Sequence, residues 1–133
     1  MQTMDTALHD LADQIRAAAA EGRPLRILGG GTKDFYGEQL QGEPLHTAGY
    51  RGITAYEPSE LVVTARCGTP LAELEATLAA QGQCLAFEPP RLAPGGTVGG
   101  MVAAGLSGPA RAQVGPCAIS CWAPPCSMGK GWH

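Results

Sequence analysis

Two glycine clusters are the residues of this chain whose types and spacing could do chemistry. The first spans residues 27–33 and reads Ile-Leu-Gly-Gly-Gly-Thr-Lys, and the second spans residues 94–106 and carries two Gly-Gly pairs. Because glycine has no Cβ, backbone N–H groups can converge there on one ligand. Two such clusters predict that a long anionic ligand is held at two places.

The first cluster fits neither of the common phosphate-binding motifs. A P-loop ends in Gly-Lys-Ser/Thr, whereas this chain has Gly31-Thr32-Lys33, and a G-x-G-x-x-G motif fails because Asp34 stands where the last glycine would be. What remains is a turn that can present successive N–H groups to an anion, with one hydroxyl and one positive charge beside them. The alternative is a tight turn in which the glycines serve geometry alone.

The second cluster precedes an alanine-rich run that reads as a helix or turn over residues 98–106. This order predicts free N–H groups at a helix N-terminus, where a pyrophosphate is favoured. The alternative is that small residues here allow a helix to pack closely on a sheet.

The elements that would position these clusters follow from hydrophobic spacing and turn residues. We expect a helix over 5–21 and strands over 24–28, 45–48, 53–56, 61–67 and 84–87. A second helix is expected after residues 69–70, with Leu71, Leu74 and Leu78 as its apolar face. Asp5 is predicted to cap the first helix and Gly22 to end it, and Thr69-Pro70 is predicted to open the second. The runs 45–48 and 53–56 are predicted to pair. The fold class is therefore α+β, a mixed sheet flanked by helices.

Composition narrows the classes of function. A chain of 133 residues holds one domain, and a net charge of −3 without a basic run argues against nucleic-acid binding. No stretch approaches the roughly 20 apolar residues that cross a bilayer. The N-terminal residues lack the basic and apolar regions of a secretory signal, so a cytoplasmic location is expected.

Several consecutive residues carry a family resemblance. The runs 58–71 and 88–109 agree in type and spacing with the vanillyl-alcohol-oxidase-type (PCMH-type) FAD-binding domain, and within it with the FAD-binding subunits of bacterial glycolate oxidases. The resemblance covers roughly residues 5–115. It implies that residues 1–112 are the first lobe of such a domain, with FAD as the cofactor.

The resemblance also implies which residues bind FAD. Carried over to this sequence, they are Gly29, Gly30, Gly31, Thr32, Lys33, Thr97, Gly99, Gly100, Ala104, Gly105 and Ser107. No catalytic residue and no metal ligand are expected on this chain, because the family binds its substrate in a separate domain. Glu88 is expected either to line the cofactor cleft or to hold a loop.

The implied activity is the oxidation of glycolate to glyoxylate within a multi-subunit complex. A larger FAD-linked oxidase subunit and an iron–sulfur subunit are the implied partners, and they would hold the chain peripherally at the inner membrane. The alternative is a truncated, catalytically inactive fragment or a module that docks on partner subunits.

Residues 113–133 form an irregular tail that holds both tryptophans and three of the five cysteines. Read from the third base of the codon of Pro116, the tail can encode Val-Arg-Asp-Phe-Val-Leu-Gly, a segment typical of the family. We therefore expect a frameshift near residue 115 that truncated a longer subunit. The alternatives are a disordered tail and a zinc site made by Cys117, Cys121, Cys126 and His133.

Overall fold

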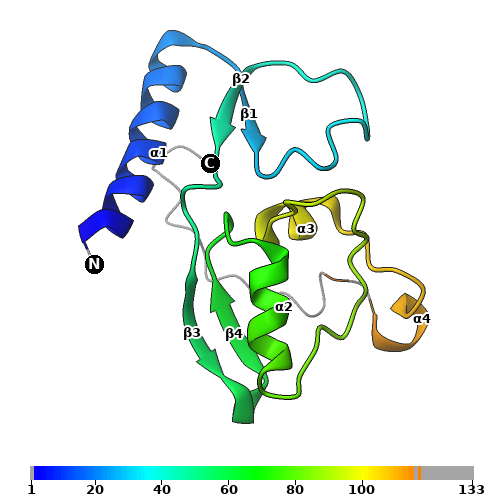
Figure 1. Ribbon diagram of the computed structural model, residues 1–133. Helices are drawn as coiled ribbons and strands as arrows, with labels where there is room; N and C mark the ends of the chain where they lie inside the picture. The colour runs from blue at the N-terminus through cyan, green and yellow to red at the C-terminus, as the bar shows by residue number, and fades with distance from the viewer. Residues whose placement is uncertain (1, 116, 118–133) are drawn as a thin grey trace.

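The computed structural model describes residues 2–115 and residue 117, which form an α+β arrangement (Figure 1). In chain order the elements are α1 Gln2–Glu21, β1 Leu25–Leu28, β2 Glu43–His46, β3 Ile53–Glu57, the 3₁₀ turn η1 Pro58–Glu60, β4 Val62–Ala65, α2 Leu71–Ala79, α3 Val98–Ala104 and α4 Arg111–Val114. None of the described helices is both long and apolar enough to cross a membrane. The predicted α+β class is confirmed.

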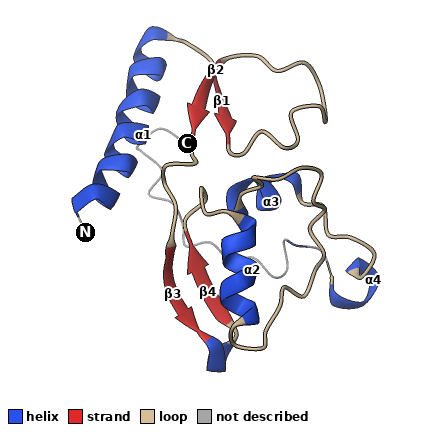
Figure 2. Ribbon diagram, in the orientation of Figure 1, coloured by secondary structure: helices blue, strands red, loops and turns tan. Residues whose placement is uncertain are grey.

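The strands are divided between two small sheets of opposite type (Figure 2). β1 pairs with β2 in parallel, from Leu25 opposite Glu43 to Leu28 opposite His46, and β3 pairs with β4 in antiparallel. The predicted pairing of 45–48 with 53–56 is therefore wrong. The segment between them crosses from one sheet to the other instead, because Tyr50 and Gly52 accept hydrogen bonds from Gly68 and Arg66 beyond β4.

Helix α1 covers the parallel sheet with only part of its length. Ala18 is buried in α1 and Leu45 in β2, whereas Leu8 and Ile15 on α1 are about half exposed. A helix of 20 residues is about 30 Å long, whereas a strand of four residues spans about 13 Å. The helix begins at Gln2, so the predicted cap at Asp5 is wrong, and Gly22 follows its end with φ +65°, as predicted.

The hydrophobic core lies between α2 and the antiparallel sheet. The predicted apolar face of α2, Leu71, Leu74 and Leu78, is buried there. These residues pack with Phe87, Met101 and Cys117, and with the partly buried Ile53, Tyr56, Val63, Leu85 and Val98. The strand predicted over 84–87 is wrong, because this segment forms no ladder, although Phe87 still fills the core with an exposed fraction of 3%.

Thr69 has a different role from the predicted one. Helix α2 begins at Leu71 without a side-chain cap, and the fully buried Thr69 hydroxyl binds Gly52 twice. It accepts from the Gly52 N–H at 2.9 Å and donates to the Gly52 carbonyl at 3.2 Å. Thr69 therefore ties the start of β3 to the turn that leads into α2.

Thr69→Val keeps the shape of the side chain but leaves the partly buried Gly52 N–H without an acceptor, whereas the Gly52 carbonyl keeps its hydrogen bond from Arg66 N–H. We expect it to lower the free energy of unfolding by about 1–3 kcal/mol, the cost of leaving a polar group unpaired in the fold. Denaturant unfolding followed by circular dichroism measures this. The control is Thr64→Val, the same change at an exposed position of β4. An equal, small effect of both variants would contradict the assignment.

Candidate functional site

The two glycine clusters meet in space, backbone against backbone. A Cβ added at Gly30 would lie 1.8 Å from the Gly95 carbonyl oxygen, and one at Gly29 would lie 2.6 Å from Oγ1 of Thr97. No side chain fits at Gly30 without moving one of the two loops. The site is therefore built where the loop after β1 touches the loop before α3 (Figure 1).

The loop after β1 offers unbonded donors. In the described part of the chain, no acceptor takes the backbone N–H groups of residues 29–33. Strand pairing ends just before this loop, since the last hydrogen bond of the parallel ladder runs from Thr47 N–H to the Leu28 carbonyl. Successive free N–H groups in a glycine turn are suited to an anion.

The first turn of α3 does not offer free donors, so the expectation of free N–H groups at the helix N-terminus is wrong for residues 98–100. Val98 N–H donates to the Thr69 carbonyl at 2.9 Å, and Gly99 N–H donates to the Cys67 carbonyl at 2.8 Å. Gly100 N–H donates to Oγ1 of Thr97, the N-cap, at 3.1 Å. The first two bonds fix α3 against the turn that follows β4, and the third caps the helix.

Gly99 allows α3 to pack closely against Cys67, which agrees with the alternative role of small residues stated in the sequence analysis. A Cβ at Gly99 would lie 2.9 Å from the Cβ of Cys67 and 3.0 Å from its carbonyl oxygen. The donors left free in the second cluster lie just before the helix. Among the described residues, the N–H groups of Gly95, Gly96 and Thr97 have no acceptor.

Geometry explains why the Thr97 N–H is free. Thr97 forms an isolated antiparallel bridge with Pro70, flanked by hydrogen bonds from Leu71 N–H to Gly96 and from Val98 N–H to Thr69. In such a non-hydrogen-bonded pair the N–H groups point away from the partner strand. The Thr97 donor is therefore directed away from Pro70.

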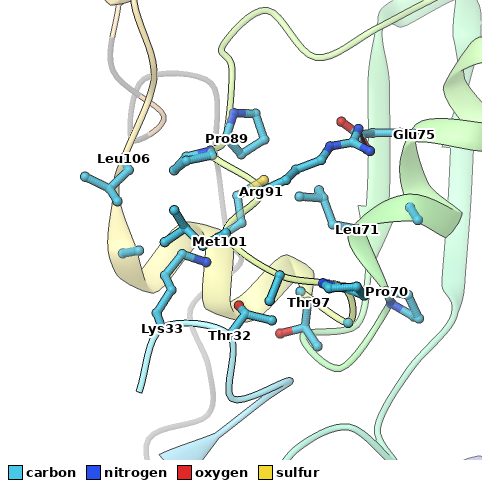
Figure 3. Close-up of a pocket in the computed structure, with 18 residues that line it drawn as sticks. Thr32, Lys33, Pro70, Leu71, Glu75, Pro89, Arg91, Thr97, Met101 and Leu106 are labelled. Carbon is cyan, nitrogen blue, oxygen red and sulfur yellow. Dashed lines mark hydrogen bonds and ion pairs between the residues drawn. The ribbon is translucent and has the colours of Figure 1, made fainter. Parts of the chain in front are cut away.

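A pocket of about 130 Å³ opens beside the two loops (Figure 3). Its lining joins Thr32 and Lys33 of the first loop to residues of α2, α3 and the loop between them. The lining residues are Thr32, Lys33, Pro70, Leu71, Ala72, Glu75, Pro89, Pro90, Arg91, Leu92, Ala93, Pro94, Gly95, Gly96, Thr97, Met101, Ala104 and Leu106.

Polar and apolar side chains both line this pocket (Figure 3). Thr32 and Thr97 lie together on one side, and Met101, Leu106 and Pro89 lie on the other, with the Lys33 side chain reaching up toward them. Pockets that enclose small ligands measure roughly 300–1,000 Å³. This pocket therefore fits one part of a large ligand that combines an anionic group with an apolar one.

The structure places four of the predicted site residues in the pocket lining: Thr32, Lys33, Thr97 and Ala104. Gly105 lies outside it and ends α3 with φ +63°. Ser107 is buried, and its hydroxyl donates to the Gly105 carbonyl at 3.2 Å and accepts from Cys117 N–H at 2.8 Å.

The other predicted site residues, Gly29, Gly30, Gly31, Gly99 and Gly100, do not line the pocket. Gly29 and Gly30 allow the two loops to touch, as described above, and Gly31 has φ +68° in the first loop. Glu88 also has a structural role, because its carboxylate accepts the Ala110 N–H at 3.1 Å.

Sequence reasoning missed Arg91, in the loop after α2, and the contribution of Leu71 and Met101 to the pocket lining. Leu71 and Met101 were assigned to the core or a helix, but they also face the pocket. Arg91 was not among the predicted site residues. Its position directly after Pro89-Pro90, a stiff segment before the second cluster, was the available signal.

Comparison with known proteins agrees with this geometry. A family model described as an FAD binding domain matches residues 6–121. The glycolate oxidase subunit GlcE of Escherichia coli (strain K12) is 46% identical over 101 residues, which cover 76% of this chain and 29% of that protein. No solved structure matches the chain. Both matches agree with the resemblance expected from residues 58–71 and 88–109, and with FAD as the cofactor.

Gly30→Ala tests whether the two loops must touch. We expect the variant to lose about 1–3 kcal/mol of unfolding free energy, as overpacked sites do, because the new Cβ would overlap the Gly95 carbonyl. Chemical denaturation measures the loss. The control is Gly49→Ala, since a Cβ at Gly49 meets nothing within 4 Å. A Gly30 variant as stable as the Gly49 variant would show that the loops separate at no cost.

Proposed function

We propose that this chain, which belongs to the FAD-binding domain family, holds the pyrophosphate of FAD between its two glycine loops. The observation that carries the proposal is the contact of Gly30 with Gly95. It holds the first loop against the second, and the N–H groups of residues 29–33 and 95–97 in these loops have no acceptor among the described residues. Converging N–H groups of glycine-rich loops bind phosphates in many nucleotide sites.

Lys33 adds the positive charge that a pyrophosphate requires. It lines the pocket, and within the described residues it forms no ion pair. Thr32 and Thr97 place hydroxyl groups beside the free N–H groups, and the Thr97 hydroxyl is already engaged with Gly100. Leu71, Met101 and Leu106 would cover an apolar part of the cofactor.

We assign the remaining predicted residues to support of this site. Gly99 and Gly100 fix the start of α3, and Gly105 and Ser107 fix its end. Ala104 presents a small side chain to the pocket. We assign no catalytic role to any of these residues, since FAD itself carries the redox chemistry and the protein positions it.

The wider proposal is an FAD-binding part of a glycolate oxidase-like subunit. The relative is named a glycolate oxidase subunit, and the alignment spans 29% of its length. In this proposal the oxidation of glycolate to glyoxylate involves a larger FAD-linked subunit and an iron–sulfur subunit. The proposed location is cytoplasmic, with the partners at the inner membrane.

The proposed domain division is residues 1–112 for the FAD-binding part and 113–133 for the tail that we attribute to a frameshift. Residues 113–115 and Cys117 are described, and Cys117 is buried. Cys121, Cys126 and His133, which the zinc alternative requires, lie outside the described residues. Sequencing the gene tests the frameshift, because a one- or two-base correction must open a reading frame that continues.

Retention of flavin distinguishes a cofactor-binding chain from an inert fragment or a docking module. The purified chain is mixed with FAD and desalted, and its visible spectrum is recorded beside its circular dichroism. A retained, structured flavin band supports the proposal. A folded but colourless chain contradicts it, and co-purification with an oxidase or iron–sulfur subunit would then favour the docking module.

Lys33→Gln removes the charge of the first loop while it keeps a polar side chain of similar reach. We expect its FAD dissociation constant to rise about tenfold, which corresponds to about 1.4 kcal/mol, because a charge-assisted contact to phosphate is lost. Fluorescence quenching of FAD measures the affinity. Arg16→Gln is the control, since it removes the same charge from an exposed position of α1. Equal affinities of the two variants would refute the role of Lys33.

A further inference from the structure

The pocket holds a second positive charge that is already paired. Nη2 of Arg91, in the loop before the second glycine cluster, contacts Oε2 of Glu75 on α2. Both residues line the pocket, and Figure 3 shows Arg91 extended toward Glu75, away from Lys33. The Arg91 side chain is 64% exposed and that of Glu75 is 26% exposed, so the pair lies at the rim.

The pair leaves the pocket with one net positive charge. Lys33 contributes a charge without an acidic partner among the described residues, whereas Glu75 neutralises Arg91. Partly exposed ion pairs contribute little net free energy, because water solvates both partners well when they separate. An anion of higher charge in the pocket can therefore compete with the Glu75 carboxylate for the guanidinium. The planar guanidinium suits phosphate oxygens in particular.

We propose that Arg91 is a second anion-binding residue of this pocket, which Glu75 holds at the rim until a pyrophosphate-bearing ligand competes for it. This inference rests on the proposed function and names the group that the site selects. Glu75 then acts as an internal competitor. It weakens the binding of singly charged anions and leaves the binding of uncharged flavins unaffected.

A purely structural role of the Arg91–Glu75 ion pair predicts different effects of substitution on anion binding. If the pair only ties the loop at Arg91 to α2, loss of either partner loosens the same loop. Both substitutions would then weaken binding in the same direction. The competitor role requires opposite signs, because loss of Glu75 frees the Arg91 charge and loss of Arg91 removes it.

The experiment compares Glu75→Gln, Arg91→Gln and the double variant with the unmodified chain. The probes are FAD, inorganic pyrophosphate and riboflavin, which has no phosphate. We expect Glu75→Gln to bind FAD and pyrophosphate about fivefold more tightly and Arg91→Gln about fivefold more weakly, in line with the size of partly exposed charge pairs. The double variant should match Arg91→Gln, and riboflavin affinity should not change.

Glu73→Gln is the matched control, because it removes the same charge from an exposed position of α2 outside the pocket. Its FAD affinity should equal that of the unmodified chain. A similar gain for Glu73→Gln and Glu75→Gln would overturn the proposal, since net charge alone would then explain it. Circular dichroism of each variant confirms that it is folded.

Two outcomes separate this inference from the proposed function. If FAD binds and both single variants bind it more weakly, the pair is only structural and the inference fails while the proposed function stands. If the unmodified chain binds no FAD, the proposed function fails. Pyrophosphate binding then tests the inference separately. The inference still requires Glu75→Gln to bind pyrophosphate more tightly than Arg91→Gln does. Equal or undetectable pyrophosphate binding by the two variants overturns the inference.

Discussion

The structure depends on contacts in which backbone meets backbone without an intervening side chain. Gly30 lies against the Gly95 carbonyl, and a Cβ at Gly68 would lie 2.1 Å from the carbonyl oxygen of Thr47. Through these contacts the unit of α1, β1 and β2 meets the unit of β3, β4, α2 and α3 (Figure 1). Each approach leaves no room for a Cβ, so the chain requires glycine at Gly30 and Gly68. A site made of both loops exists only while these contacts hold.

The backbone N–H groups near these contacts fall into two groups, those with an acceptor in the protein and those without one. The N–H groups of Val98, Gly99 and Gly100 are satisfied inside the protein: the first two hold α3 on the turn after β4, and the third caps α3. Those of residues 29–33 and 95–97 have no acceptor in the described part of the chain. Unsatisfied donors beside Lys33 make a local environment for negative charge, although the chain as a whole carries a net charge of −3. Anion binding here follows from local geometry and not from overall charge.

The sequence predicted correctly the features that depend on residues close together in the chain. The helical spacing of Leu71, Leu74 and Leu78 predicted the buried face of α2, and Gly22 predicted the end of α1. It was insufficient where several partners were possible. Strand pairing was misassigned because each inner strand has a neighbour on either side in the chain: β2 pairs with β1 before it and β3 pairs with β4 after it, not with each other. Thr69 was misassigned because its hydroxyl binds Gly52, 17 residues earlier. Likewise, the glycine clusters indicated an anion site, but spacing could not show which N–H groups remain free or that Glu75 meets Arg91.

An amide-resolved NMR titration with FAD tests the central claim most directly, because it reports on each N–H group separately. The account predicts that the amide signals of residues 29–33 and 95–97 shift together with one dissociation constant. It also predicts that the signals of Val98, Gly99 and Gly100, whose donors are already engaged, move much less. Large shifts at the start of α3 with unchanged signals in the two glycine loops would contradict it.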